Sequence, residues 1–425
     1  MSTVRVTSPL PKPRGRGATP VSIAVGALVG ALTVALLVVL WSLAATLVAG
    51  LTTTLPVGQA LLVGLAIGAA VGALRTGADT APVLAVGIGL AAGAAWLAAT
   101  GLRPLGLEAV RPVWGVGFAL LLLGLAGHLV RYALRGIDFR RLRRDLLETI
   151  AVRLLRGFAF AFFGLIILFP FWYMLSASLK GRADMLRDPA NLAIEWGYGV
   201  NQLLVGYREV LFTFDFLNFI GNSFLVAFVT MTVTLVMAVL GAYAITRLAF
   251  PGRTFLARSI LLIYMFPAIV LVIPLYAVFT QLGLRDTLPG LLIVYPATTI
   301  PVALYMLRSY FQTLPKDLEE AGLIDGCTRA QVIWRITLPL AMPAIASVGL
   351  YVFMIAWNEF LFAFMFLDDP SIFTLPRGMV MLDSQEVPRQ YLMAGAMIIT
   401  VPVMILFFWF EKYLVGGLTA GGVKG

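Results

Sequence analysis

The sequence contains almost none of the residues that build disulfides and metal sites, and few charges. Among its 425 residues there is one cysteine, Cys327, and one histidine. A single cysteine excludes an internal disulfide and a thiolate cluster, and a single histidine excludes a histidine-based metal centre. Charged residues make up 12% of the chain, hydrophobic residues 60%, and mean hydropathy is +0.94. A water-soluble chain of this length needs more polar surface, so most of this chain must face lipid.

Signatures of catalysis are lacking as well. No lysine follows a glycine, so the sequence has no Gly-Lys-Ser/Thr loop of the kind that holds ATP phosphates. A membrane-embedded enzyme, such as a lipid-linked sugar transferase, requires clustered acids, histidines or a metal site at one membrane face, and no such cluster is found. We therefore predict that this chain is not an enzyme, has no catalytic residue and binds no metal or cofactor.

What the sequence does have is a series of long apolar segments. A helix needs about 20 apolar residues to cross about 30 Å of hydrocarbon, and backbone groups left unbonded in lipid are too costly for other structures. Ten segments meet this rule, near 22–49, 57–74, 81–100, 113–130, 157–178, 218–246, 257–281, 288–307, 341–366 and 391–413. The sequence therefore predicts an all-α, polytopic membrane protein with about ten transmembrane helices.

The arginines between these segments predict the orientation. Residues 131–156 hold eight arginines against three acids, and residues 247–258 add three arginines and no acid. Both stretches fall on the same side as the basic N-terminus, which the positive-inside rule makes cytosolic. The loops near 180–217 and 367–390 then fall outside, and neither is long enough for a substrate-binding domain. The net charge of +10 is accounted for by anionic lipid, so no nucleic-acid partner is expected.

The composition divides the chain into five parts. The first apolar run, from Val21 to Gly50, is too long for a signal peptide and is expected to be a membrane span with the N-terminus in the cytosol. We predict a basic cytosolic tail, four accessory transmembrane helices, a basic cytosolic linker, a six-helix core and a glycine-rich cytosolic tail at 1–20, 21–130, 131–156, 157–414 and 415–425. Glycines four residues apart in the accessory helices, such as Gly64 and Gly68, predict close helix packing.

One predicted cytosolic loop, residues 309–339, is much longer and more ordered in pattern than a plain connection. It is expected to form two short helices. Pro315 suits a first helical position, and Gly326 suits a left-handed stop. Thr328 with Gln331 spells a capping box for the second helix, which Pro339 is expected to end.

The apolar residues of this loop follow helical spacing. Three fall on one face of the first helix and three on one face of the second: Leu314, Leu318 and Ala321, then Val332, Ile333 and Ile336. Two capped amphipathic helices form a rigid object that a partner protein is able to push.

The spacing within this loop resembles a known family. Glu320-Ala321-Gly322, three residues, Gly326, nine residues, Ile336, one residue and Leu338-Pro339 is similar to the EAA loop of binding-protein-dependent ABC importer permeases. In that family the loop is the coupling helix that docks on the ATPase. The resemblance therefore implies an ATPase-coupling role for Glu320, Ala321, Gly322, Asp325, Gly326, Ile336, Leu338 and Pro339. Gly322 departs from the family pattern, which usually has alanine there.

Further motifs resemble the carbohydrate branch of that family. These are Phe266-Pro267 through Tyr276, Leu282 through Thr287, Trp357 through Phe360, and the C-terminal residues from Glu411. The resemblance covers about residues 150–425. It implies import of a maltose-, maltodextrin- or other oligosaccharide-like sugar across the cytoplasmic membrane.

The same resemblance implies partners that this chain lacks. They are a dimer of ATPase subunits, which uses ATP and Mg, a second homologous permease subunit, and an external sugar-binding protein. In the family, the C-terminal tail reaches between the ATPase subunits. Contacts there are implied for Gly421, Gly422 and Lys424.

A sugar pathway is expected where prolines interrupt the spans. Prolines at 267, 274, 296 and 301 each remove an intrahelical bond and permit a bend. Aromatic faces suit the apolar faces of sugar rings, and amides suit the hydroxyls. The candidate lining residues are Tyr276, Phe279, Gln281, Tyr295, Trp357 and Asn358, for which helix packing is the alternative role.

A secondary transporter driven by an ion gradient is the alternative function. Such proteins place ionisable relays or broken helices at the midplane of paired repeats. This sequence has few charges within its spans, of which Glu359 is the most notable acid, and no visible repeat joins its halves. The ordered loop at 309–339 has no task in that alternative. Dependence of uptake on nucleotide would distinguish the two.

Overall fold

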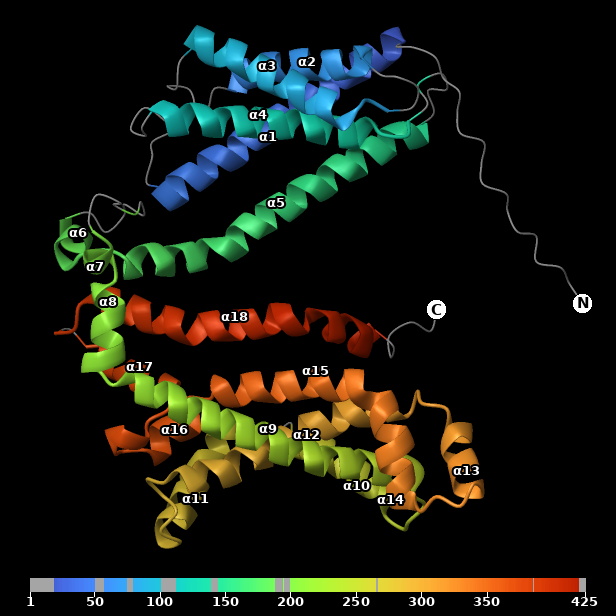
Figure 1. Cartoon of the computed structure of the whole chain (residues 1–425), viewed down its shortest axis with the longest axis vertical. Coiled ribbons are helices and arrows are strands. Elements are labelled where there is room, and N and C mark those ends of the chain that lie inside the picture. The colour runs from blue at the N-terminus through green and yellow to red at the C-terminus, as the bar shows by residue number, and fades with distance from the viewer. Residues whose placement is uncertain are drawn as a thin grey trace, which may run out of the picture. The chain divides into compact units, whose positions relative to one another are not determined.

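A computed structural model of the chain shows a protein whose regular elements, in the residues described, are all helical (Figure 1). The structure describes residues 19–49, 57–74, 79–100, 112–137, 139, 144–187, 194, 199–264, 267–384 and 386–419. The chain forms two compact units. The first consists of residues 1–176 and 188–194, and the second of residues 177–187 and 195–425.

The first unit is built from five long helices. They are α1 (Pro20–Ala49), α2 (Val57–Ala73), α3 (Pro82–Thr100), α4 (Pro112–Leu134) and most of α5 (Arg144–Ser178). Helix α1 packs mainly on α2, and α3 packs mainly on α4. A Cβ atom added to Gly68 would overlap the carbonyl oxygen of Gly26, and one added to Gly30 would overlap that of Gly64. The glycines thus let the two backbones touch, as their spacing predicts.

Helix α5 crosses the boundary that the composition suggested. It starts at Arg144, inside the arginine-rich stretch, and runs without a break to Ser178. The division between the compact units lies at residues 176/177, whereas the composition changes near 156/157. Arginine is a good helix former, so a change from basic to apolar residues need not interrupt the backbone.

The second unit contains the remaining helices. They are α6 (Arg182–Arg187), α7 (Val200–Leu203), α8 (Val205–Arg208), α9 (Phe216–Arg247), α10 (Arg253–Tyr264), α11 (Ala268–Gln281), α12 (Leu288–Phe311), α13 (Lys316–Ile324), α14 (Arg329–Val332), α15 (Leu338–Trp357), α16 (Leu361–Phe366), α17 (Leu375–Leu382) and α18 (Arg389–Thr419). Three single turns, η2 (Glu209–Thr213), η3 (Ile333–Thr337) and η4 (Pro370–Ile372), lie between them.

Helix α9 is the centre of this second unit. It packs along α12 and α15, and α15 packs in turn on α18. The hydroxyl groups of Thr234 and Thr299 share a buried hydrogen bond of 2.7 Å between α9 and α12. Trp357 donates from Nε1 to the carbonyl oxygen of Ile399 at 3.2 Å, which joins α15 to α18. These two hydrogen bonds link neighbouring helices inside the apolar bundle.

The ten predicted spans are all represented by helices. Within the part of the chain that the structure describes, seven helices are long and apolar enough to cross a membrane, and three more, within 57–73, 119–134 and 268–281, are shorter but apolar. Two predicted spans are interrupted, however. The span predicted at 257–281 is two helices, α10 and α11, because Pro267 adopts an extended conformation before α11. A proline has no N–H with which to continue a helix.

The span predicted at 341–366 is also broken, between α15 and α16. Asn358 ends α15, and Glu359 caps α16 by accepting hydrogen bonds from the N–H groups of Phe362 at 2.9 Å and Ala363 at 3.2 Å. This intramembrane acid therefore has a local structural role at a helix N-terminus.

The last helix is longer than the sequence suggested. The glycine-rich tail was expected to begin at Val415, but α18 continues to Thr419. The two glycines at 416 and 417 disfavour helix by about 1 kcal/mol each, which a helix already 27 residues long is able to tolerate. The predicted contact residues Gly421, Gly422 and Lys424 lie outside the described residues.

Candidate functional site

The loop between α12 and α15 forms two short helices, as its pattern predicts (Figure 1). Helix α13 ends at Ile324, and Gly326 follows with φ of +86°. The N–H of Cys327 donates to the carbonyl oxygen of Gly322 at 3.0 Å, and that of Gly326 donates to Leu323 at 3.1 Å. These two hydrogen bonds form a Schellman motif, which satisfies the last carbonyl groups of α13 and requires a left-handed residue. The prediction for Gly326 is confirmed.

The second helix of the loop starts with the predicted capping box. The N–H of Gln331 donates to the Thr328 hydroxyl at 3.3 Å, and the N–H of Thr328 donates to Gln331 Oε1 at 2.8 Å. Each side chain thus satisfies a backbone donor that the first turn leaves open.

Two proline assignments were wrong. Pro315 precedes α13 as its N-cap, with ψ of 127°, instead of occupying the first helical position. Pro339 does not end the second helix, because a π-helical turn, η3, joins α14 directly to α15. The N–H of Leu338 bonds to Ile333, five residues back. Pro339 follows at once, so its missing N–H falls where the hydrogen-bond pattern changes.

A buried ion pair holds this loop to α9. Arg247, the last residue of α9, donates from Nε to Glu319 Oε1 at 2.9 Å and from Nη2 to the Leu314 carbonyl oxygen at 3.0 Å. The Thr337 hydroxyl donates to the same Glu319 oxygen at 3.2 Å. The side chains of Arg247 and Glu319 are 6% and 9% exposed. One carboxylate therefore joins α9, α13 and η3.

The predicted inner face of α13 was wrong by one position. Leu318 and Ala321 are exposed, whereas Glu319 and Gly322 are buried. The partner that makes burial of a glutamate favourable is Arg247, which is 72 residues away in the sequence. A search for apolar faces does not detect such a pair. The inward positions of α14 and η3 fit better, since Val332 is fully buried.

The loop exposes several large apolar side chains among its charged ones. On α13, Ile324 is 85% exposed, and Leu318 and Leu323 are also exposed. On η3, Trp334 is 73% exposed. Large exposed apolar side chains on a capped, polar segment are typical of an interaction surface. We name these four residues the docking patch.

The residues implied by the EAA pattern divide into two groups. Glu320, Ala321, Asp325, Gly326 and Pro339 are exposed, Ile336 and Leu338 are partly buried, and Gly322 is buried. A Cβ atom on Gly322 would lie 2.6 Å from Cδ1 of Ile336. The absence of a side chain at Gly322 therefore lets η3 approach α13.

The six predicted pathway residues do not converge on one cavity. Phe279, Tyr295 and Trp357 are buried in the core of the second unit, where Phe279 contacts Phe366 and Trp357 stacks on Phe353. Tyr276 lies beneath the guanidinium of Arg285, 4.9 Å from the ring centroid. Gln281 and Asn358 are exposed.

Of the six, Asn358 is in a groove. This groove, of about 420 Å³, lies between the end of α15, helix α17 and α18. Its other lining residues are Phe360, Pro376, Met379, Val380, Asp383, Leu392 and Ile399. Sequence reasoning missed Pro376, Met379 and Val380 because α17 lies in a segment treated as a loop. Apolar walls with one amide and one carboxylate match the composition of small-ligand sites.

Two loops on the predicted outer side are tied together by Asp286. Its Oδ1 accepts the N–H groups of Asp369 at 3.0 Å and Asp368 at 2.8 Å. The bond from Asp369, with smaller help from that of Asp368 and from the charge of Arg285, lowers the pKa of the Asp286 carboxyl below its usual range although partial burial opposes this. Arg285 also pairs with Asp368. The connection after α11 is thereby fixed to the segment after α16.

The described residues do not meet the requirements of a metal site. Within the described ranges, no three side chains of histidine, cysteine, aspartate or glutamate converge as metal ligands.

Known proteins match this chain over its second part. A family described as "Binding-protein-dependent transport system inner membrane component" matches residues 235–419. The inner membrane ABC transporter permease protein YcjP of Escherichia coli K12 is 40% identical over 269 residues, which are 62% of this chain and 94% of YcjP.

Two relatives with named sugars are also similar. The trehalose/maltose transport system permease protein MalG of Thermococcus litoralis is 36% identical, over 65% of this chain and 99% of MalG. The trehalose transport system permease protein SugB of Mycobacterium tuberculosis is 34% identical, over 61% of this chain and 93% of SugB. About a third of this chain has no counterpart in these alignments.

A solved structure supports the same relationship. It is a crystal structure of a bacterial ABC transporter involved in the import of the acidic polysaccharide alginate. Its matching chain is 25% identical, with a TM-score of 0.51, over 64% of this chain and 98% of that chain. Three observations indicate the same family. They are the capped two-helix loop, the all-helical membrane fold of the described residues, and the near-complete coverage of these relatives. The chain belongs to the family of binding-protein-dependent transport system inner membrane components, and is a permease subunit of an ABC importer.

Proposed function

We propose that this permease moves an oligosaccharide-like sugar into the cell, driven by a separate ATPase that docks on the loop formed by α13, α14 and η3. The observation that carries this proposal is the docking patch on a loop held rigidly by the Glu319–Arg247 pair. Relatives with similar sequences are named for trehalose, maltose and arabinooligosaccharides. The chain itself is proposed to hydrolyse nothing, and ATP and Mg are used by the partner.

The route by which a push on the loop reaches the bundle follows from its contacts. Glu319 joins the loop to the end of α9, and α9 packs along α12 and α15. The π turn joins the loop directly to α15. A movement of α13 is therefore transmitted to α9 through the ion pair and to α15 through the π turn. A buried pair suits this task because its geometry is specific and its loss is costly.

The partners follow from the same family. We propose a dimer of ATPase subunits against the docking patch and against Glu320, Ala321, Asp325 and Gly326. A second permease subunit and an external sugar-binding protein complete the importer. The arginine distribution supports a cytosolic N-terminus, and we propose on that basis that the loop faces the cytosol.

The groove beside Asn358 is the proposed sugar contact on this chain. Phe360 and Met379 supply apolar walls, and Asn358 and Asp383 supply polar groups that are able to bond sugar hydroxyls. Of the pathway residues predicted from sequence, Asn358 is retained in this proposal. Phe279, Tyr295 and Trp357 are proposed to act in packing.

The experiment is uptake of labelled maltose and trehalose by proteoliposomes that contain the complete importer with its binding protein. We expect uptake to require hydrolysable ATP inside and binding protein outside. Ionophores that remove proton and sodium gradients are expected to leave uptake unchanged. Uptake driven by an ion gradient without ATP would instead establish the secondary-transporter alternative.

A further inference from the structure

The first unit contains a groove that the transport function does not use. It lies between α1, α4 and residues 153–161 of α5, is open on one side, and has a volume of about 110 Å³. Its walls are mostly apolar, and five of the twelve lining residues are leucines, among them Leu36 and Leu40 of α1 and Leu154 of α5. On α5 the lining runs from Arg153 to Ala161, which is about 12 Å of helix.

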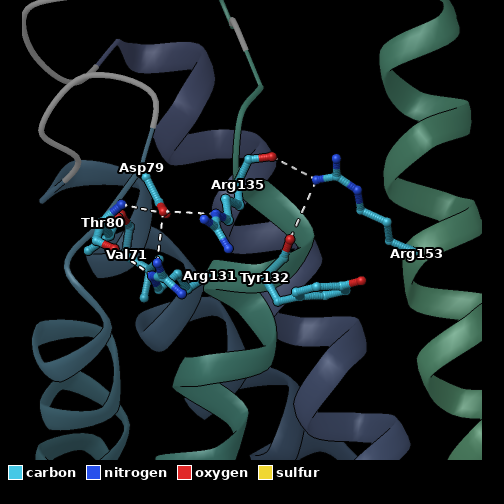
Figure 2. Close-up of polar contacts among 7 residues, drawn as sticks. All are labelled: Val71, Asp79, Thr80, Arg131, Tyr132, Arg135 and Arg153. Carbon is cyan, nitrogen blue, oxygen red and sulfur yellow. Dashed lines mark hydrogen bonds and ion pairs between the residues drawn. The ribbon is translucent and has the colours of Figure 1, made fainter.

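Polar side chains meet at one end of this groove. Figure 2 shows Arg153 of α5 reaching toward the end of α4, with the Tyr132 ring pointing into the same space. Nη1 of Arg153 donates to the carbonyl oxygens of Arg135 at 2.7 Å, Ala133 at 3.2 Å and Tyr132 at 3.5 Å. The guanidinium is thus held by the negative end of α4. These contacts use only Nη1, so they leave Nε and Nη2 for another acceptor.

The charge around this end is positive even after the visible ion pairs are counted. Asp79 Oδ2 lies 2.8 Å from Arg131 Nη2 and 3.4 Å from Arg135 Nε (Figure 2). One carboxylate therefore faces two arginines, and the Arg135 side chain remains 63% exposed. Arg153 and the exposed Arg156 add two further charges one turn apart.

An apolar groove with a basic end, in a unit built of membrane helices, matches one class of ligand. We propose that it binds a phospholipid with an anionic headgroup. An acyl chain lies along Leu36, Leu40 and Phe158, and the headgroup phosphate meets the guanidinium of Arg153. Anionic lipid is attracted to basic residues at the cytosolic surface, and a guanidinium binds phosphate oxygens well.

The groove offers a clean substitution. A Cβ atom on Gly157, which lines the groove, has no atom within 4 Å, so Gly157→Leu fills the groove without displacing backbone. Gly164 lies two turns further along α5, also has open space at its Cβ position, and does not line the groove. Gly164→Leu is therefore the matched control.

The test counts bound lipid by native mass spectrometry on the full-length chain, purified, stripped of lipid and titrated with dioleoyl phosphatidylglycerol or dioleoyl phosphatidylcholine. We expect the wild type and Gly164→Leu to hold one tightly bound phosphatidylglycerol and to bind phosphatidylcholine about fivefold more weakly. Gly157→Leu should lose the tight site for both lipids.

Arginine variants test the headgroup separately. Arg153→Gln should bind the two lipids equally, and Arg153→Lys should keep the preference for phosphatidylglycerol because it keeps the charge. Arg258→Gln, at an exposed arginine of α10, should behave as wild type. Tight phosphatidylglycerol binding that survives Gly157→Leu would overturn the groove. Equal binding of both lipids by the wild type would overturn the anionic headgroup.

Discussion

At the scale of single residues, two neighbours in α13 have opposite environments. Glu319 is buried against Arg247, whereas Glu320 is exposed. The sequence gives no local sign of this difference, since both are acids in the first turns of a short helix. The left-handed conformation of Gly326 was predictable because the glycine and the capping box that follows it are local sequence signals. The Glu319–Arg247 pair was not, because it depends on how α9 and α13 meet in space.

Glu319→Gln should destabilise the loop, because it leaves the Arg247 guanidinium buried without a counter-charge. Removing one partner of a buried pair costs about 3–5 kcal/mol. Glu320→Gln, the matched control, should change stability by less than about 0.5 kcal/mol. The melting temperature of the purified protein is the measurement, because Glu320 is also proposed to contact the ATPase and is therefore a control for stability alone.

A double variant distinguishes the effect of an unpaired buried charge from the effect of lost packing at Arg247 and Glu319. Arg247→Met combined with Glu319→Leu removes both charges and should recover most of the lost stability, since apolar residues of similar size often replace buried pairs without loss. If Glu319→Gln and Glu320→Gln have the same small effect, the pair does not hold the loop.

Gly326→Leu should abolish ATP-driven uptake while the protein still inserts into the membrane. A side chain there meets no atom within 4 Å, so the cost comes from φ of +86° and not from a clash. A left-handed residue with a Cβ atom costs about 1–2 kcal/mol. Asparagine tolerates this conformation better, so Gly326→Asn should retain more uptake. Wild-type uptake by Gly326→Leu would contradict the assignment of this loop.

At the scale of elements, the sequence predicted where helices lie better than where they break. Apolar length identifies a span, but it cannot distinguish one helix from two that meet at Pro267 or at Asn358. The long α5 shows the opposite error, because a change in composition near residue 156 suggested a boundary where the backbone has none. Groove residues on α17 were missed because eight residues are too few to be read as a span.

The C-terminal segment gives a prediction at this scale. Truncation after Thr419 keeps all of α18 and removes Gly421, Gly422 and Lys424. We expect insertion to be unchanged. The family resemblance implies that this tail lies between the ATPase subunits, where glycines would permit close backbone approach. On that proposal, stimulation of ATP hydrolysis by sugar-loaded binding protein should fall. Equal stimulation in the truncated and full-length complexes would show that the tail does not couple.

At the scale of the whole molecule, the first four helices, α1 to α4, are expected to be an addition to the permease. The relatives are covered almost completely by about two thirds of this chain. Deleting residues 1–143 removes four predicted spans and leaves α5 intact. Because an even number of spans is lost, the second unit should keep its orientation. The deletion also removes most of the arginines before α5, and this loss favours the opposite orientation.

The single cysteine reports that orientation. Cys327 is a free thiol in the loop after α13, and it is partly exposed. In sealed cells, a membrane-impermeant maleimide should label neither the full-length nor the shortened chain until the membrane is opened. Labelling of the shortened chain in sealed cells would show that residues 1–143 are needed for correct insertion.

The glycine contacts of α1 and α2 have a genetic consequence. A single base change in a glycine codon that alters the amino acid replaces it with a residue that has a Cβ atom, or with a stop. At Gly26, Gly30, Gly64, Gly68 and Gly72 that atom would collide with the facing backbone. At Gly58, Gly87 and Gly117 it would meet nothing within 4 Å. In a random mutant library selected for sugar uptake, depletion of variants at the first five relative to the last three would therefore measure how much growth depends on the accessory helices.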